Sequence, residues 1–172
     1  MAQLTFKPGN DAIIINTSGE LPAVGERAPD FSLVDGRLNE VSLASYTGKN
    51  KVLNIVPSLD TPVCAASARM FNEKTLRFGN AVVLMVSADL PFAQSRFCEA
   101  EGLKHVIPLS TFRSSFADDY GVRLVDSMLA GLTARAVMII DANDRIVYTE
   151  LVTEITHEPN YDEVLDVLKE LQ

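Results

Sequence analysis

The amino-acid sequence predicts an α/β fold in which helices flank a mixed central β-sheet. Apolar segments of strand length alternate with segments of helical periodicity through the middle of the chain, and a β-hairpin and an amphipathic helix follow them. The chain has 172 residues, of which 47% are apolar and 22% are charged. Because that length can bury one sizeable core, we expect a single domain over residues 1–172.

The N-terminal residues 1–17 predict a β-hairpin extension. Two short strands, Leu4–Lys7 and Ala12–Asn16, are separated by the turn-forming segment Pro8–Asp11. A connector containing proline and glycine follows. After it come two weak strands, Phe31–Val34 and Glu40–Leu43.

The strongest strand and helix signals are adjacent at the centre of the chain. Lys51–Val56 is largely apolar and bounded by turn formers, which is typical of a buried central strand. Val63–Phe78 has helical periodicity, and Pro62 suits the first turn of that helix. The face that we expect to pack on the sheet consists of Ala68, Phe71, Thr75 and Phe78.

A second strand and helix repeat this arrangement. Ala81–Ser87 is a buried strand by pattern, and Pro91–Glu101 is a helix that stops at Gly102. We expect Cys98 to lie beside the packed face of this helix rather than at its centre. The residues predicted to form that face are Ala93, Phe97 and Ala100.

The C-terminal half predicts shorter elements and one apolar loop. The predicted elements are a strand at His105–Leu109, a helix at Ser114–Tyr120, a hairpin of Ala136–Ile140 and Ile146–Leu151, and a closing helix at Tyr161–Leu171. Asn160 and Glu163 form a capping-box-like start for the last helix. Its predicted core face consists of Val164, Leu165, Leu168 and Leu171. The loop Val122–Leu132 has no regular periodicity, and we expect it to form a dimer contact, one wall of an apolar pocket near Arg135, or a cover over the core.

Charge and cysteine content narrow the class of protein. The net charge is −8, and the whole acidic excess lies in residues 87–172, which carry 15 acidic and 7 basic side chains. An acidic chain without a basic stripe argues against nucleic acid or an anionic membrane as a partner. No apolar stretch is long enough to span a membrane, and the N-terminus does not resemble a secretory signal. We therefore expect a cytoplasmic protein, with a trimmed export signal as the open alternative.

Cys64 is the residue with the clearest chemical potential. It follows a predicted central strand and stands in the first turn of a predicted helix, where the helix dipole favours a thiolate. Thr61 supplies a hydroxyl three residues upstream, and Cys98 is the only other cysteine. The alternative is that each cysteine is a small buried hydrophobic residue.

Several other chemistries fit the sequence poorly. The segment Cys64-Ala65-Ala66-Ser67 lacks the second cysteine of a C-x-x-C dithiol motif. A cysteine hydrolase would need a histidine, and His105 and His157 are more readily structural. Two isolated cysteines and two isolated histidines do not form a zinc site, and no glycine-rich phosphate loop is present. We expect no metal and no cofactor.

The order of strands and helices is that of a thioredoxin-like fold, and three blocks of sequence carry a closer resemblance. The segment Pro57–Cys64, with Thr-Pro-Val-Cys at its end, looks like the peroxidatic motif of peroxiredoxins. In combination, Asp60–Ser67, Ser87–Cys98 and Ala130–Val137 resemble the bacterial thiol peroxidase subfamily over nearly the whole chain.

The resemblance implies a homodimeric enzyme that reduces hydrogen peroxide or alkyl hydroperoxides with thioredoxin as electron donor. It implies Cys64 as peroxidatic cysteine, Cys98 as resolving cysteine in an intrachain disulfide, and Thr61 and Arg135 as activators. Pro62 and Val63 would belong to the loop that shields the thiolate. These roles are chemically reasonable, because displacement of an alkoxide needs hydrogen-bond donors aimed at the developing negative charge.

Each role has a structural alternative. Thr61 could be the N-cap of the helix, Arg135 a surface or ion-pairing arginine, and Cys98 a packed core thiol. The corresponding alternative for the whole chain is a non-catalytic thioredoxin-fold module that senses oxidation or binds a partner.

Overall fold

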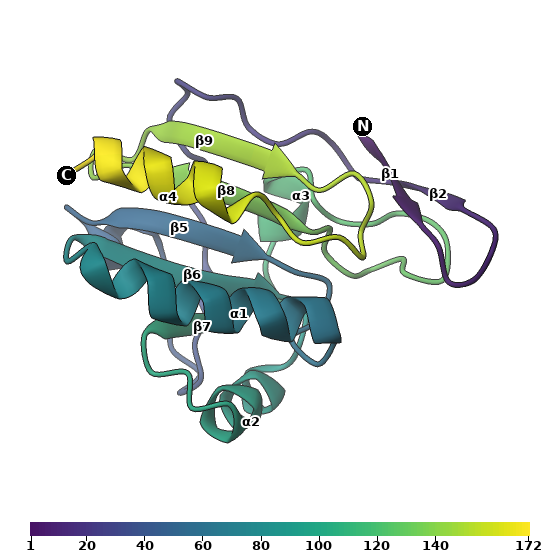
Figure 1. The fold of residues 1–172 in the computed structure, drawn as a ribbon, viewed down its shortest axis with the longest axis horizontal. Coiled ribbons are helices and arrows are strands. Elements are labelled where there is room, and N and C mark those ends of the chain that lie inside the picture. The colour runs from purple at the N-terminus through teal and green to yellow at the C-terminus, as the bar shows by residue number, and fades with distance from the viewer.

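A seven-stranded mixed sheet organises the computed structural model, which describes residues 1–172 (Figure 1). The strand order is β4-β3-β7-β6-β5-β8-β9, and β5 pairs parallel with β6 and antiparallel with β8. In chain order the strands are β3 (Leu33–Val34), β4 (Glu40–Val41), β5 (Asn50–Ile55), β6 (Ala81–Ser87), β7 (Val106–Ser110), β8 (Ala136–Ile140) and β9 (Ile146–Leu151). The expected thioredoxin-like fold is confirmed.

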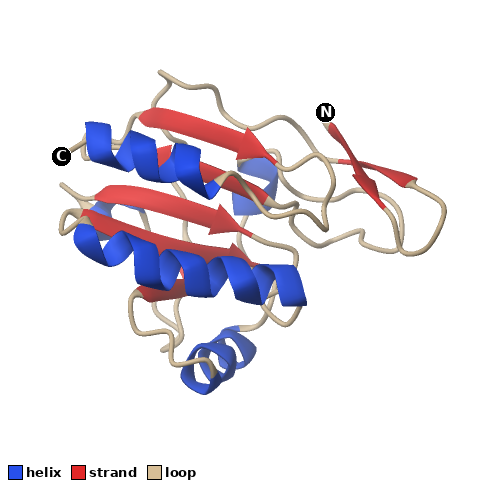
Figure 2. Cartoon of the chain, in the orientation of Figure 1, coloured by secondary structure: helices blue, strands red, loops and turns tan.

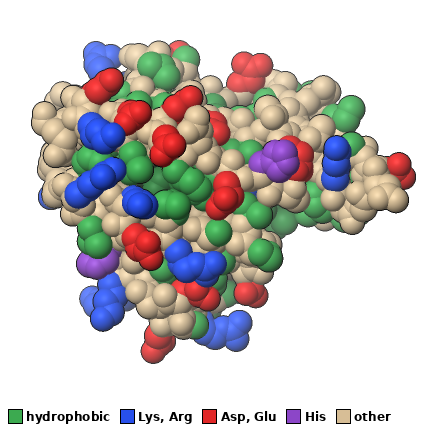
Figure 3. Space-filling view, in the orientation of Figure 1, with side chains coloured by type: hydrophobic (Ala, Val, Ile, Leu, Met, Phe, Trp, Pro, Cys, Tyr) green, Lys and Arg blue, Asp and Glu red, His purple; other side chains and the backbone are tan.

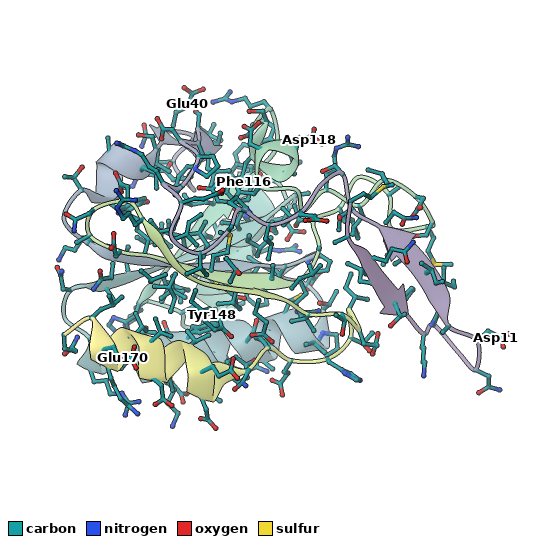
Figure 4. All side chains as sticks on the ribbon, turned by 90° about the horizontal axis from the view of Figure 1, so that it is seen from above. Asp11, Glu40, Phe116, Asp118, Tyr148 and Glu170 are labelled. Carbon is teal, nitrogen blue, oxygen red and sulfur yellow. The ribbon has the colours of Figure 1, made fainter.

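Helices cover both faces of this sheet (Figure 2). The helices are α1 (Pro62–Lys74), α2 (Pro91–Ala100), α3 (Phe116–Asp119) and α4 (Tyr161–Glu170), with short 3₁₀ helices η1 (Leu43–Tyr46) and η2 (Thr75–Arg77). Figure 4, which views the sheet nearly edge-on, places Phe116 of α3 on the side opposite to α4. None of the helices is both long and apolar enough to cross a membrane.

The strand β5 lies at the centre of the core because both of its faces are covered. All six of its residues are buried, and neighbouring side chains belong to different apolar clusters. Val52 packs with Phe71 of α1 and Val164 of α4, whereas Leu53 packs with Phe116 of α3. Burial on both faces explains why this strand reads as an apolar run rather than as an alternating pattern.

The predicted N-terminal hairpin is confirmed. The strands β1 (Gln3–Phe6) and β2 (Ile13–Asn16) pair antiparallel and project from one end of the molecule (Figure 1). The hairpin is attached to the main body through backbone hydrogen bonds. Thr5 N–H donates to the Thr153 carbonyl at 2.7 Å and the Thr5 carbonyl accepts from Ile155 N–H at 2.9 Å.

The first long helix is shorter than the sequence indicates. We expect a helix over Val63–Phe78, but the α-helix ends at Lys74 and continues only as η2. The reason is local, because the hydroxyl of Thr75 donates to the Phe71 carbonyl and Phe78 N–H closes a tighter turn on the Thr75 carbonyl at 2.9 Å. The predicted packed face is nevertheless correct, since all four of its residues are buried.

The predicted packed face of α2 is wrong. Ala93 and Ala100 are exposed and Phe97 is half-buried, whereas the buried residues of the helix are Pro91, Gln94 and Cys98. A polar side chain can face the sheet here because the Gln94 amide donates to the Ser87 hydroxyl and to the Leu109 carbonyl, both at 2.9 Å. Cys98 is therefore on the packed face and not beside it.

The start of α4 follows the prediction in part. The side chain of Asn160 accepts from Glu163 N–H at 3.3 Å, which is the expected N-cap contact. The reciprocal bond of a capping box is absent, because Asn160 N–H donates to the Glu150 carboxylate instead. Val164, Leu165 and Leu168 are buried as predicted, and Leu171 is half-buried.

Acidic and basic side chains are interspersed over the face shown in Figure 3. This view shows no extended basic stripe.

Candidate active site

Cys64 is the third residue of α1 and is completely buried. The chain leaves β5, passes through an irregular turn and enters the helix with Pro62 at its first position. Proline is well accommodated there because the first N–H groups of a helix have no intrahelical acceptor. The amides of Val63 and Cys64 belong to the same turn, so the sequence places positive backbone dipoles next to the sulfur.

Arg135 is bound to the sulfur of Cys64. Its Nη1 donates to Cys64 Sγ at 3.2 Å, while its Nε donates to the Ile155 carbonyl at 2.7 Å. The arginine is 3% exposed, so its guanidinium is held in a site that excludes most water. An arginine fixed in this way stabilises negative charge on the sulfur and on any oxygen bound there. The alternative of a surface arginine does not describe this residue.

Thr61 occupies the N-cap position of α1 without capping it through its side chain. Its hydroxyl instead donates to the Ser58 carbonyl at 3.1 Å, which tightens the turn before the helix. The side chain is half-buried and lines the same cavity as Arg135. Thr61 therefore presents its hydroxyl oxygen, a potential acceptor or donor, at the entrance to the cysteine.

A cavity of about 370 Å³ lies above the Cys64 turn. Its lining residues are Phe6, Pro57, Ser58, Thr61, Pro62, Val63, Leu129, Leu132, Arg135, Ile155 and Thr156. Leu129 and Leu132 come from the apolar loop Val122–Leu132, so this loop lies where the sequence suggested, next to Arg135. The cavity is thus mainly apolar, with its polar groups concentrated at the cysteine end.

The N-terminal hairpin supports two walls of this cavity, which sequence reasoning missed. Phe6 of β1 lines it directly, and Thr5 binds the backbone of Ile155, whose carbonyl holds Arg135. On the other strand, the Asn16 side chain and amide donate to the Asp126 carboxylate at 2.6 and 2.9 Å. These two hydrogen bonds lower the pKa of Asp126. The hairpin therefore fixes both the arginine anchor and the apolar loop.

Buried polar residues behind Cys64 also escaped the sequence analysis. Ser67 donates to the Cys64 carbonyl at 3.0 Å and accepts from the Asn54 amide at 3.0 Å. The Thr133 hydroxyl donates to the Val56 carbonyl at 2.6 Å, where β5 ends. The only signal for these residues was the presence of polar types within apolar segments, which does not by itself identify their partners.

Cys98 lies outside this cavity. It is 9% exposed on the packed face of α2, its sulfur has no hydrogen-bond partner, and burial raises the pKa of its thiol to about 11. Both cysteines are free and belong to the same apolar cluster, which packs between the sheet and the helices α1 and α4. The structure therefore shows two separate thiols, of which only Cys64 has a charged partner.

The histidines do not form part of the site. His105 is exposed, and His157 is 73% exposed and lies 3.2 Å from the carboxylate of Glu154. No group of three or more histidine, cysteine or acidic side chains is arranged to hold a metal ion.

Comparisons with known proteins agree with this geometry. The redoxin family model matches residues 23–165. The chain is 54% identical over 168 residues to the thiol peroxidase of Mycobacterium tuberculosis strain H37Rv, covering 98% of this chain and 99% of that protein.

Two solved structures resemble the whole chain. A peroxiredoxin-like protein from Aquifex aeolicus superimposes with a TM-score of 0.91 at 40% identity, covering 100% of this chain and 98% of that one. A thiol peroxidase from Chromobacterium violaceum gives a TM-score of 0.90 at 22% identity, covering 99% and 97%, and at that identity supports the fold alone. By family match, sequence identity and fold, the chain belongs to the redoxin family, within its branch of thiol peroxidases and peroxiredoxins.

Proposed function

We propose that this thiol peroxidase reduces hydrogen peroxide and alkyl hydroperoxides through a Cys64 sulfenic acid and an intrachain Cys64–Cys98 disulfide, and that thioredoxin recycles it. The observation that carries the proposal is the 3.2 Å hydrogen bond from the buried Arg135 to Cys64 Sγ at the end of an apolar cavity. A buried cysteine with an aimed cation is arranged for nucleophilic chemistry rather than for packing.

The first step is attack of the Cys64 thiolate on one peroxide oxygen. The S–O bond forms, the O–O bond breaks, and the leaving alkoxide or hydroxide takes a proton to become an alcohol or water. Negative charge moves from sulfur to oxygen, so donors around both atoms lower the barrier. Arg135, the Thr61 hydroxyl and the first-turn amides of Val63 and Cys64 are the donors available there.

The second step consumes the thiol of Cys98. Its sulfur attacks the sulfenic sulfur of Cys64, the disulfide forms and water leaves. Because Cys98 is packed on the inner face of α2, this helix or the first turn of α1 must open first. A dithiol such as thioredoxin then exchanges with the disulfide, so that the donor is oxidised and both cysteines return to thiols.

The shape of the cavity supports a preference for bulky alkyl hydroperoxides over hydrogen peroxide. Phe6, Leu129 and Leu132 can contact an organic substituent, which hydrogen peroxide lacks. On the same loop Val125 and Met128 are exposed, and we assign this loop surface to a homodimer contact. The two free thiols favour a reducing compartment, and we place the enzyme in the cytoplasm.

The test is peroxide consumption by the purified protein with thioredoxin, thioredoxin reductase and NADPH. We expect catalytic turnover, and a monomer-sized band for the oxidised wild type in non-reducing electrophoresis. A covalent dimer would contradict the intrachain mechanism. If the protein binds partners but consumes no peroxide with any thiol donor, it is a sensing or interaction module.

The variant Cys98→Ser separates the two steps. We expect it to consume one equivalent of peroxide and to stop at the Cys64 sulfenic acid, which a small thiol can reduce. Multiple turnovers with thioredoxin at the wild-type rate would remove Cys98 from the mechanism.

A further inference from the structure

The carboxylate of Asp89 connects the segments that carry the two cysteines. Asp89 lies between β6 and α2, and its side chain accepts three hydrogen bonds. The donors are the Ser58 hydroxyl at 2.8 Å, Leu59 N–H at 2.8 Å and the Ser87 hydroxyl at 2.7 Å. Ser58 and Leu59 belong to the turn that leads into Cys64. The carboxylate therefore spans from the start of one cysteine-bearing helix to the start of the other.

The hydrogen bonds continue toward Cys64 beyond Asp89. The Ser58 carbonyl accepts from the Thr61 hydroxyl at 3.1 Å, and the Thr61 carbonyl accepts the first intrahelical bond of α1 from Ala65 N–H at 2.9 Å. The turn itself has no regular secondary structure, so these contacts determine its conformation. Displacing the turn would move Thr61 and the first-turn amides away from the sulfur.

They also continue toward Cys98. The Ser87 hydroxyl, which donates to Asp89, accepts from the Gln94 amide at 2.9 Å. Gln94 is completely buried on the same face of α2 as Cys98, one helical turn before it. We call the contacts among Ser58, Leu59, Ser87, Asp89 and Gln94 the Asp89 network. Through it the packing of α2 depends on the same carboxylate that shapes the turn before Cys64.

Physical chemistry makes this carboxylate more than a surface contact. Hydrogen bonds to an ionised acceptor are roughly twice as strong as neutral ones, and no ion pair of Asp89 competes with its three neutral donors. Leu59 is 1% exposed, so its N–H would lose its partner in a site with little water if the carboxylate were removed. The network therefore stabilises the closed arrangement of both helices at the same time.

We propose that Asp89 is a positioning residue that couples the two half-reactions: it holds the Cys64 turn in the conformation that attacks peroxide, and its contacts with Ser58 and Leu59 must break before Cys98 reaches the sulfenic acid. This inference rests on the proposed function. It predicts a trade-off, in which weakening the network slows attack on peroxide and speeds disulfide formation.

The decisive variant is Asp89→Asn, which keeps the size of the side chain but removes its charge and one of its acceptor oxygens. Its matched control is Asp60→Asn, which removes the same charge from an exposed position in the same turn, where the side chain makes no hydrogen bond. Quenched-flow mass spectrometry measures thiol, sulfenic acid, disulfide and sulfinic acid over time. We expect a tenfold to hundredfold slower loss of the thiol in Asp89→Asn, as for a catalytic group displaced by about 1 Å.

The second readout is the fate of the sulfenic acid. Resolution competes with further oxidation to sulfinic acid, so faster resolution lowers the fraction of sulfinic acid formed at high peroxide. We expect at least a threefold lower sulfinic fraction in Asp89→Asn than in wild type and in Asp60→Asn, which should match each other. A merely structural loss of fold would slow both steps and would not improve resolution.

Three outcomes would overturn the inference. Both steps could be unchanged in Asp89→Asn, both could slow together, or Asp60→Asn could show the same trade-off. Ser58→Ala, which deletes only one donor, provides the same test with a smaller expected change if Asp89→Asn does not fold. Failure of the proposed function is separate, because the wild type itself would then form no sulfenic acid.

Discussion

Cys64 and Cys98 are both buried thiols, yet their surroundings differ in nearly every other respect. Cys64 stands in the first turn of a helix, accepts a hydrogen bond from a buried arginine and lies beneath a cavity. Cys98 stands near the end of a helix and has no hydrogen-bond partner, and its pKa is raised to about 11 by burial. The difference shows that burial alone does not decide reactivity; the charges and donors around a buried sulfur do.

The two sites also differ in how far along the chain their parts are gathered. The Cys64 site unites a turn after β5, the start of β8, a segment after β9 and the N-terminal hairpin. Cys98 depends mainly on the packing of a single ten-residue helix. Changes near Cys64 should therefore alter chemistry, whereas changes near Cys98 should alter helix opening and stability.

The sharpest test of the comparison exchanges each sulfur for oxygen. We expect Cys64→Ser to lose all peroxide reduction, because a hydroxyl without a strong base is a poor nucleophile toward peroxide. Stoichiometric peroxide consumption measured by mass spectrometry checks this, with Cys98→Ser as the matched single-sulfur control. Residual turnover above a few per cent in Cys64→Ser would assign the nucleophile to Cys98.

The next test removes the charged partner that only Cys64 possesses. Arg135→Met should lower the second-order rate constant with peroxide by roughly two to three orders of magnitude, which corresponds to about 2.7–4 kcal/mol of transition-state stabilisation. Arg123→Met, at an exposed arginine paired with Asp118, is the control and should leave the rate unchanged. An unchanged rate in Arg135→Met would mean that this arginine is structural.

A smaller effect should come from the cavity wall, which Cys98 lacks. Leu129→Ala should lower kcat/KM for cumene hydroperoxide by roughly three- to thirtyfold, because several methyl and methylene contacts are lost, and should change the value for hydrogen peroxide little. Met128→Ala removes an exposed side chain from the same loop outside the cavity and is the control. Equal losses on both substrates would argue against a role of Leu129 in selectivity.

The smallest expected effect concerns the raised pKa of Cys98. Because the folded state favours the neutral thiol, its contribution to stability is fully present below the ordinary pKa of 9.0 and is lost as pH rises toward about 11. Between pH 8.5 and 10.5 the unfolding free energy of the wild type should fall more steeply than that of Cys98→Ala, by on the order of 1 kcal/mol. Comparing slopes removes the cavity cost of the alanine, and the tyrosines titrate in both proteins. Parallel curves from urea unfolding would contradict the assignment.

Local patterns in the sequence were sufficient for the elements around Cys64. The apolar run of β5, Pro62 and the helical periodicity of α1 each depend on neighbouring residues, and these elements and the packed face of α1 form as predicted. The family resemblance then singled out Arg135, which lies 71 positions from Cys64 and which no local pattern connects to it.

Only the tertiary structure decided which face of α2 is buried and what encloses the cavity. The periodicity favoured Ala93, Phe97 and Ala100, but Gln94 finds its two acceptors on β6 and β7 and so turns the helix the other way. Phe6, Ile155 and the Asp89 network reach the site through contacts between distant segments. Side-chain periodicity reports only whether a residue is apolar, whereas the burial of a polar group depends on partners that the folded chain brings to it.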